Sequence, residues 1–312
     1  MLISSLTKIA VATLLFGAAT SSFAGPMQGF FRHRGGRQQL GNRNFDRSAE
    51  QSGPVTLPAG ARLVQNVAYG ADSAQRFDVY IPPNARNAPV IFMVHGGGWS
   101  RGDKAASNVV QNKINHFLPM GYIFISTNYR MVPQVGVMTE AEDVARALAY
   151  VQQHAAEWGG DSSRLVVMGH SAGAHLVALM TSAPSIWQGA GARPWLGTVA
   201  LDSAAYNVVT IMESQHYPFY DRVFGDDQQL WQAVSPTLQL RSTPPPMLLV
   251  CSSLRSNSCD QASAFADKAQ SLGGHVKVVP VELKHSEVNM DVGSSAPITS
   301  EIDAFLHSLG LN

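Results

Sequence analysis

The chain has 312 residues, of which 45% are hydrophobic and 14% are charged, so it can bury a sizeable core and fits one α/β domain. Its 22 basic and 22 acidic side chains give a formal net charge of zero. Because five arginines lie between residues 25 and 60, the remainder from residue 61 onward is net negative. This body lacks the basic face that nucleic-acid binding requires, so we expect no nucleic-acid partner.

The first residues predict the compartment. Lys8 precedes an apolar run over residues 9–19, and Ser22, Phe23 and Ala24 fit the small-x-small pattern of a cleavage site. The apolar run is too short to span a bilayer. We therefore predict a signal peptide over residues 1–24 and an exported protein, periplasmic or secreted, with no stable membrane insertion after the signal is removed.

The next segment, residues 25–60, is rich in glycine, arginine, glutamine and asparagine. It shows almost no apolar periodicity, and a chain of this composition cannot bury a core of its own. We predict a disordered arm here and assign no function to it. The folded domain is then expected over residues 61–312.

Strand and helix patterns alternate through the expected domain. Segments 62–68 and 76–81 are predicted to form the antiparallel edge of a sheet. Further strands are predicted at residues 90–94, 122–127, 165–168, 198–201, 247–250 and 275–281, and helices at residues 106–117, 139–153, 174–181, 261–272 and 298–309. This alternation indicates a mostly parallel central sheet with helices on both faces, whose reactive loops gather at the carboxyl ends of the strands.

The strand at 90–94 runs directly into residues 95–99, with the sequence HGGGW. Three successive glycines let the backbone come close to a bound acyl group. The amides of Gly97 and Gly98 can then hold the oxyanion of a tetrahedral intermediate, as this stretch does in lipases and esterases. We therefore predict an oxyanion hole in this loop.

A second motif, GHSAG, occupies residues 169–173 at the end of the strand predicted for 165–168. Gly169 and Gly173 leave room for a sharp strand-to-helix turn, which pushes the Ser171 hydroxyl out above the sheet. The helix that follows points its positive N-terminal end at this serine. Ser171 is thus predicted to be a nucleophile, and the Ala172 amide a third donor to the oxyanion.

Residues 206–235 contain many aromatic residues and a methionine without strand periodicity. We interpret this segment as a short helical cap over the site. Such a composition suits packing, and it also suits a surface that shapes a pocket for an acyl or alcohol group.

The HGGGW loop and the GHSAG elbow together resemble those of the α/β-hydrolase family, in particular its small carboxylesterases of the hormone-sensitive-lipase-like and feruloyl-esterase-like kinds. The resemblance covers about residues 62–309. It implies the α/β-hydrolase fold and hydrolysis of small or medium acyl esters by Ser171 through an acyl-enzyme. Residues 169–176 (GHSAGAHL) are also similar to the elbow of arylformamidases, which cleave N-formyl amides, so an amidase is the alternative enzyme.

In this family the histidine of the catalytic triad comes last in the sequence. Here His285 follows the last predicted strand, on a loop that the resemblance places beside the serine, and we predict that it is the general base. No pair of histidines shows metal-ligand spacing with a matching carboxylate, so we expect neither a metal nor another cofactor.

Two cysteines, Cys251 and Cys259, are present in the chain. In an exported protein a close pair of this kind favours a disulfide over two free thiols. Such a bridge would tie the start of the helix predicted for 261–272 to the end of the strand predicted for 247–250.

The triad acid departs from the family pattern. Many relatives carry an aspartate a few residues past the strand that here ends at residue 250, where this chain has Arg255 or a near neighbour. We predict Asp260, the nearest carboxylate on that connection, although it also suits an N-terminal cap of the next helix. Asp202 and Asn257 are the alternatives, and the displaced acid leaves open a catalytically silent binding scaffold.

Overall fold

The computed structural model describes residues 53–311, so the predicted signal peptide and most of the predicted arm lie outside the described residues. The end of the predicted arm belongs to the domain instead. The Thr56 amide donates to Gln111 Oε1 at 2.7 Å, and the Thr56 carbonyl accepts from Gln111 Nε2 at 2.8 Å. Val55 and Leu57 pack against the core. The boundary that we expected at residue 61 is therefore too late in the chain.

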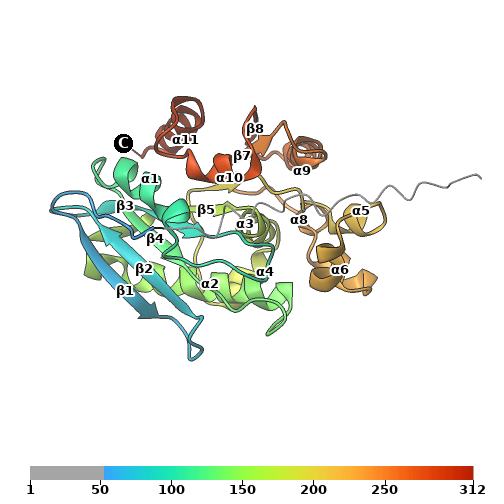
Figure 1. Ribbon diagram of the computed structural model, residues 1–312, viewed down its shortest axis with the longest axis horizontal. Helices are drawn as coiled ribbons and strands as arrows, with labels where there is room; N and C mark the ends of the chain where they lie inside the picture. The colour runs from blue at the N-terminus through green and yellow to red at the C-terminus, as the bar shows by residue number, and fades with distance from the viewer. Residues whose placement is uncertain (1–52, 312) are drawn as a thin grey trace, which may run out of the picture. The chain divides into compact units, whose positions relative to one another are not determined.

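An eight-stranded sheet with the order β1-β2-β4-β3-β5-β6-β7-β8 forms the centre of the domain (Figure 1). The strands are β1 (Arg62–Ala68), β2 (Arg76–Ile81), β3 (Ala88–Val94), β4 (Ile123–Thr127), β5 (Gly160–His170), β6 (Gly197–Leu201), β7 (Met247–Ser252) and β8 (Val276–Val281). The β1–β2 and β2–β4 pairs are antiparallel, and all other pairs are parallel. The predicted antiparallel edge and parallel body are confirmed.

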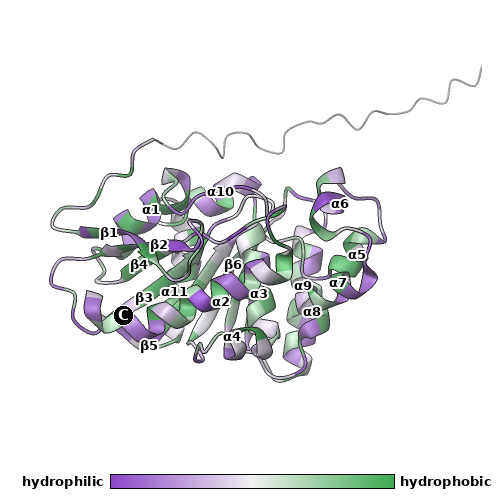
Figure 2. Ribbon diagram, turned by 90° about the horizontal axis from the view of Figure 1, so that it is seen from below, coloured by the Kyte–Doolittle hydropathy of each residue, from purple (hydrophilic) through white to green (hydrophobic). Residues whose placement is uncertain are grey.

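The central strands β3, β6 and β7 are mostly apolar, and β5 is apolar in its second half, because helices cover both faces of the sheet. In β3, Phe92 and Val94 belong to one hydrophobic cluster, while Ile91 and Met93 belong to the cluster on the opposite face. Most of β3 is accordingly coloured as hydrophobic in Figure 2. This continuous run is what made the strand recognisable in the sequence.

Five long helices form the two covering layers. The first cluster, on one face, contains residues of α2 (Val137–His154) and α3 (Ala172–Ser182), and α9 (Ser258–Ser271) packs against β7 and β8. The second cluster contains residues of α1 (Ser107–Phe117) and α11 (Ala296–Ser308). Within residues 53–311 every helix is too short or too polar to cross a lipid bilayer.

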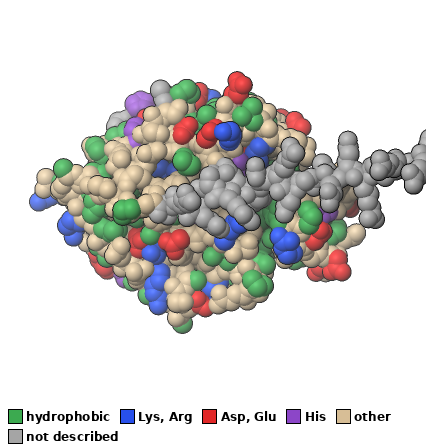
Figure 3. Space-filling view, viewed as in Figure 1, with side chains coloured by type: hydrophobic (Ala, Val, Ile, Leu, Met, Phe, Trp, Pro, Cys, Tyr) green, Lys and Arg blue, Asp and Glu red, His purple; other side chains and the backbone are tan. Residues whose placement is uncertain are grey.

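Short helices occupy the connections at the carboxyl ends of the strands and elsewhere. The predicted cap is helical, with α5 (Val208–Met212), α6 (Pro218–Phe224) and α7 (Gln228–Ala233), followed by α8 (Pro236–Gln239). The sequence analysis did not foresee α4 (Pro184–Gly189), the 3-10 turn Ala155–Trp158 or α10 (His285–Met290). On the face drawn in Figure 3, basic and acidic side chains are interspersed.

Candidate active site

Ser171 lies at the turn between β5 and α3 with φ 54° and ψ −117°, a conformation that non-glycine residues rarely adopt. Its amide is held by the Leu201 carbonyl of β6 at 2.9 Å. A Cβ atom on Gly169 would lie 2.4 Å from the Gly173 oxygen, and one on Gly173 would lie 2.2 Å from the Val94 oxygen. Both glycines are therefore required for the sharp turn, as the motif predicted.

A continuous hydrogen-bonded chain joins three side chains from three different connections. The Ser171 hydroxyl lies 2.8 Å from His285 Nε2, and His285 Nδ1 lies 2.6 Å from Asp202 Oδ2. Asp202 directly follows β6 and its side chain is fully buried, whereas that of His285 is 25% exposed. With Nδ1–H donating to the carboxylate, Nε2 is free to accept the proton of the serine.

The prediction that Asp260 orients the histidine is wrong. Asp260 lies in the first turn of α9 with an exposed side chain, where its charge suits the helix N-terminus. Asn257, the residue before α9, is also exposed. The carboxylate bonded to His285 is that of Asp202, our alternative, which follows the carboxyl end of β6.

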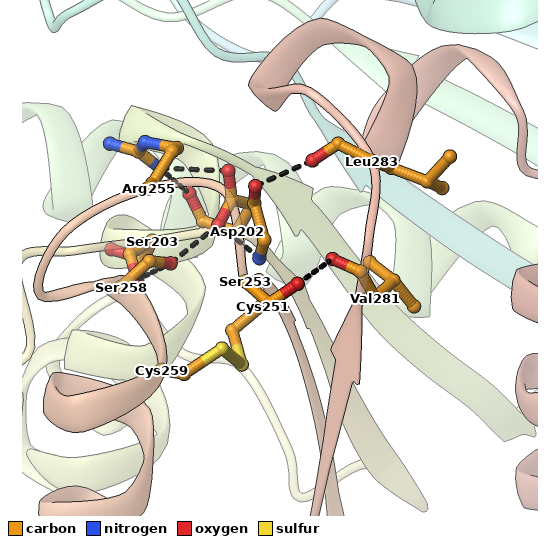
Figure 4. Close-up of a disulfide and its surroundings, with 10 residues drawn as sticks. Asp202, Ser203, Cys251, Ser253, Arg255, Ser258, Cys259, Val281 and Leu283 are labelled. Atoms are coloured by element: carbon orange, nitrogen blue, oxygen red, sulfur yellow. Dashed lines mark hydrogen bonds and ion pairs between the residues drawn. A yellow bond between two sulfur atoms is a disulfide. The ribbon is translucent and has the colours of Figure 1, made fainter.

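Residues at the end of β7 and in the loop that follows it hydrogen-bond to the Asp202 carboxylate (Figure 4). Its Oδ1 atom accepts from the Ser252 amide at 2.8 Å and from the Ser258 hydroxyl at 2.5 Å, and its Oδ2 atom accepts from Arg255 Nη1 at 2.8 Å. Burial alone would raise the pKa of Asp202, but the hydrogen bond to His285 and the Arg255 charge hold that pKa well below its usual value. The carboxylate is therefore ionised throughout the neutral range.

The predicted disulfide is present between Cys251 and Cys259. It closes the loop that carries Ser252, Arg255 and Ser258, the three residues that grip Asp202 (Figure 4). The bridge therefore acts on the triad acid, although on a different acid from the one that we predicted.

Reduction of this disulfide should lower kcat even at temperatures at which the reduced protein stays folded. Freeing so short a loop destabilises a protein by about 2–3 kcal/mol, whereas a displacement of about 1 Å at a catalytic group can cost about 100-fold in rate. Measuring kcat and Tm with and without dithiothreitol tests this, beside a Cys251→Ala/Cys259→Ala variant that has no bond to reduce. Loss of activity only in step with unfolding would contradict it.

His170, on the elbow, supports the catalytic geometry in a way that the sequence analysis missed. Its ring packs on that of His285, with centroids 4.6 Å apart, and its Nε2 donates to the His285 carbonyl at 2.9 Å. Burial and the neighbouring His285 lower the pKa of His170 well below its usual value, so this ring is neutral. It fixes the backbone of His285 from directly beside the serine.

Lys113 on α1 holds the other end of α10. Its fully buried Nζ donates to the Asn289 carbonyl at 2.6 Å and to Asn289 Oδ1 at 2.8 Å. Burial lowers the pKa of Lys113 to about 7. Because His285 is the first residue of α10, Lys113 and His170 together fix the position of this short helix.

The glycine loop lies against the nucleophile. A Cβ atom on Gly96 would lie 2.8 Å from the Ser171 Cβ, and one on Gly97 would lie 2.0 Å from the Arg101 carbonyl. Gly97 and Gly98 both have positive φ, at 132° and 60°. Ala172 is the first residue of α3, so its amide has no acceptor within the helix. These features keep the three amides as candidate donors to an oxyanion.

His175 links the glycine loop to the cap. Its Nδ1 accepts from Trp99 Nε1 at 3.1 Å, and its Nε2 donates to the Val234 carbonyl, after α7, at 2.7 Å. Trp99 in turn packs on Tyr220 and Phe224 of α6. The AHL extension of the elbow, which suggested an arylformamidase, thus has a structural explanation in this chain.

Replacing His175 should weaken the dependence of the free energy of unfolding on pH below about pH 7. Burial lowers the pKa of His175 from 6.5 to about 4, so its contribution is present above pH 6.5 and is lost as the pH falls towards 4. Between about pH 7 and 5 this amounts to about 2 kcal/mol. The His175→Gln variant retains a donor for Val234 but has no group that titrates at this position. Between about pH 7 and 5, its free energy of unfolding, measured in urea, should therefore fall by about 2 kcal/mol less than that of the parent protein.

The exposed His275 provides the control, because His275→Gln should keep the pH dependence of the parent protein. Equal pH dependence of His175→Gln and the parent would contradict the neutral, buried state of His175.

Solved structures with this architecture are esterases. Esterase B from Lactobacillus rhamnosis superposes with a TM-score of 0.65 at 21% identity, covering 82% of this chain and 88% of the other. An esterase from Thermogutta terrifontis gives 0.66 at 23% identity, covering 81% and 93%. The family model BD-FAE matches residues 77–186, which contain both the glycine loop and the elbow. The chain has the α/β-hydrolase fold.

Curated relatives of this chain include proteins named as esterases and carboxylesterases. Isoprenylcysteine alpha-carbonyl methylesterase from Arabidopsis thaliana is 26% identical over 238 residues, covering 69% of this chain and 54% of the relative. Esterase LipQ from Mycobacterium tuberculosis is 27% identical over 226 residues, covering 65% and 53%. Carboxylesterase NlhH from the same species is 36% identical over 128 residues, covering 41% and 40%. The chain thus spans about half the length of these relatives.

Among residues 53–311, no group of three or more histidine, cysteine or acidic side chains is arranged to hold a metal ion. Three histidines around Ser171 have partners in the protein: His285 bonds Asp202, His170 bonds the His285 carbonyl, and His175 bonds Trp99 and Val234.

Proposed function

We propose that this protein is a serine carboxylesterase that hydrolyses small or medium acyl esters through an acyl-enzyme. The hydrogen-bonded chain from Ser171 through His285 to the buried Asp202 is the observation that carries the proposal. A serine hydroxyl is a weak nucleophile until a positioned base removes its proton, and His285 is placed to be that base.

In the proposed reaction, Ser171 Oγ attacks the ester carbonyl carbon while His285 Nε2 takes the hydroxyl proton. The amides of Gly97, Gly98 and Ala172 stabilise the oxyanion of the tetrahedral intermediate. The carbon–oxygen bond to the alcohol then breaks, and the imidazolium returns its proton to the leaving alkoxide. A water molecule, deprotonated by His285, attacks the acyl-enzyme and releases the carboxylic acid and the free serine.

The relatives support an ester as substrate, since those matched over most of this chain are named esterases. A structure of Lactobacillus rhamnosis esterase B is described as inhibited with a tributyrin phosphonate, a small ester-like molecule. By this analogy we propose a small-molecule ester as the substrate of the present chain.

An assay series tests the substrate class. Initial rates are compared for p-nitrophenyl acetate, butyrate and octanoate and for N-formylaniline, with Ser171→Ala as the blank. We expect hydrolysis of the short esters and little of the formamide, because the relatives matched over most of this chain are named esterases. Preferential cleavage of the formamide would favour the amidase. Hydrolysis of no compound by the folded protein would favour the silent scaffold.

We also propose that the protein is exported. The N-terminal pattern of residues 8–24 and the Cys251–Cys259 bridge support this, because structural disulfides persist in oxidising compartments. N-terminal sequencing of protein recovered outside the cytoplasm should begin at Gly25. An intact Met1 on protein confined to the cytoplasm would contradict the proposal.

A further inference from the structure

Arg255 lies where the family pattern leads one to expect the triad acid, and it reaches back to the acid one strand away. Its Nη1 atom donates to Asp202 Oδ2 at 2.8 Å and to the Asp202 carbonyl at 3.0 Å (Figure 4). The same nitrogen lies 3.0 Å from His285 Nδ1. The Arg255 side chain is 29% exposed, while that of Asp202 is fully buried.

The approach of Arg255 to His285 is electrostatic. The His285 Nδ1 proton points to Asp202 Oδ2 at 2.6 Å, so Nδ1 has no lone pair to offer the guanidinium. Asp202 favours a protonated imidazole, and a positive charge at 3.0 Å opposes it. The two effects act on the same ring from the same side.

Other charged groups around His285 are few or already committed. Lys284 and Glu287, at the start of α10, lie 3.5 Å from each other. His170 on the elbow is neutral, and Lys113 is engaged by Asn289 at the far end of α10. Tyr206 and Tyr220 lie near Asp202 and Arg255, and burial raises the pKa of both phenols, so they carry no charge at neutral pH. Asp202 and Arg255 therefore dominate the charge beside the imidazole.

Loss of Arg255 would leave most of the hydrogen bonds to the Asp202 carboxylate in place. Ser252 and Ser258 hold Oδ1, and His285 still bonds Oδ2. A variant without the guanidinium therefore changes the charge next to the imidazole more than it changes the position of the carboxylate.

Resting on the proposed function, we propose that Arg255 is a positioning residue of the reaction. It bonds the Asp202 carboxylate and partly offsets its charge, so that the imidazole of His285 stays neutral, and able to act as a base, at lower pH than the aspartate alone would allow. Arg255 thereby extends esterase activity towards acidic conditions.

The test compares the pH dependence of kcat/KM for a neutral aryl ester between about pH 4.5 and 9, in Arg255→Met and Arg255→Lys. We expect Arg255→Met to move the acidic limb of the kcat/KM profile to higher pH by about one unit. At a fixed pH on that limb, kcat/KM should then be about tenfold lower than in the parent protein. At high pH the loss should be smaller and should fall on kcat more than on KM. Arg255→Lys, which retains the charge, should move the limb back towards that of the parent.

Arg130→Met is the matched control. Arg130 also pairs with a fully buried aspartate, Asp143, at 2.7 Å, and its side chain is 23% exposed. Whatever its effect on stability, this control should leave the acidic limb unmoved. An unmoved limb in Arg255→Met, or an equal shift in Arg130→Met, would overturn the inference.

A second readout separates this inference from the proposed function. NMR titration of the His285 ring in a Ser171→Ala background gives the midpoint pH at which the imidazole is protonated. Adding Arg255→Met should raise this midpoint by the same amount as it moves the kcat/KM profile. If the parent protein hydrolyses no ester, the proposed function fails while this titration still decides the role of Arg255. If esters are hydrolysed and the titration is unchanged by Arg255→Met, only the role of Arg255 fails.

Discussion

Ser171→Ala should lower kcat for a short-chain ester by about 10⁶-fold, to the level left by binding and oxyanion stabilisation alone. The serine hydroxyl is the group that bonds to substrate in the proposed mechanism, and no described side chain other than His285 is hydrogen-bonded to it. The variant should fold normally because the elbow geometry rests on Gly169, Gly173 and the amide of residue 171. Burst and steady-state kinetics measure the loss.

His285→Ala in the same assay should cost about as much, because serine and histidine act as a unit. The double variant should therefore be hardly slower than either single variant. Additive losses in the double variant, or a Ser171→Ala protein that keeps a tenth of the parent rate, would contradict the assignment.

Asp202→Asn should lower kcat by about 10⁴-fold with little change in KM. The asparagine can keep a similar shape, but its amide cannot stabilise an imidazolium, and it favours the wrong tautomer of His285. Because three groups from the loop after β7 bond to this carboxylate, the variant should also unfold more easily. Rates are therefore compared at temperatures at which both proteins are folded.

Asp260→Asn is the control that separates the two candidate acids. Its side chain is exposed on α9, so its kcat should stay within about twofold of the parent rate, as is usual for surface substitutions away from a site. The opposite ranking, with Asp260→Asn inactive and Asp202→Asn active, would require a different arrangement of the loop after β7.

Features set by local backbone geometry were predictable from the sequence. The elbow at Ser171 and the loop at Gly97 and Gly98 each follow an apolar strand, and a Cβ atom on Gly97, Gly169 or Gly173 would collide with backbone. The order of strands and helices followed from the same hydrophobic periodicity. These signals act over a few residues, so one chain is enough to detect them.

The choice of acid was not predictable in this way. β6 and β7 are parallel neighbours, so Asp202 and the loop after β7 lie at the same edge of the sheet. Which of them reaches His285 depends on contacts 50 or more residues apart, such as those of Ser252 and Arg255 with Asp202. The arginine in the usual place of the acid was the available signal, and its charge pointed to a carboxylate elsewhere.

The surroundings of His285 show both a missed local signal and a contact without one. Glu287 accepts from the Lys284 amide at 2.7 Å, a capping interaction that marks the start of α10 and is readable as an acidic residue two positions after His285. By contrast, Lys113 lies 176 residues from Asn289 in the sequence, and nothing near it indicates its role.

Covalent labelling is the most direct test of the central claim that Ser171 is an activated nucleophile. The folded, oxidised protein is treated with a fluorophosphonate, and the adduct is located by peptide mass spectrometry. One adduct per chain on Ser171, slowed in His285→Ala and Asp202→Asn but unchanged in Asp260→Asn, is the predicted result. No adduct on the folded protein, or an adduct at a different residue, would contradict the claim.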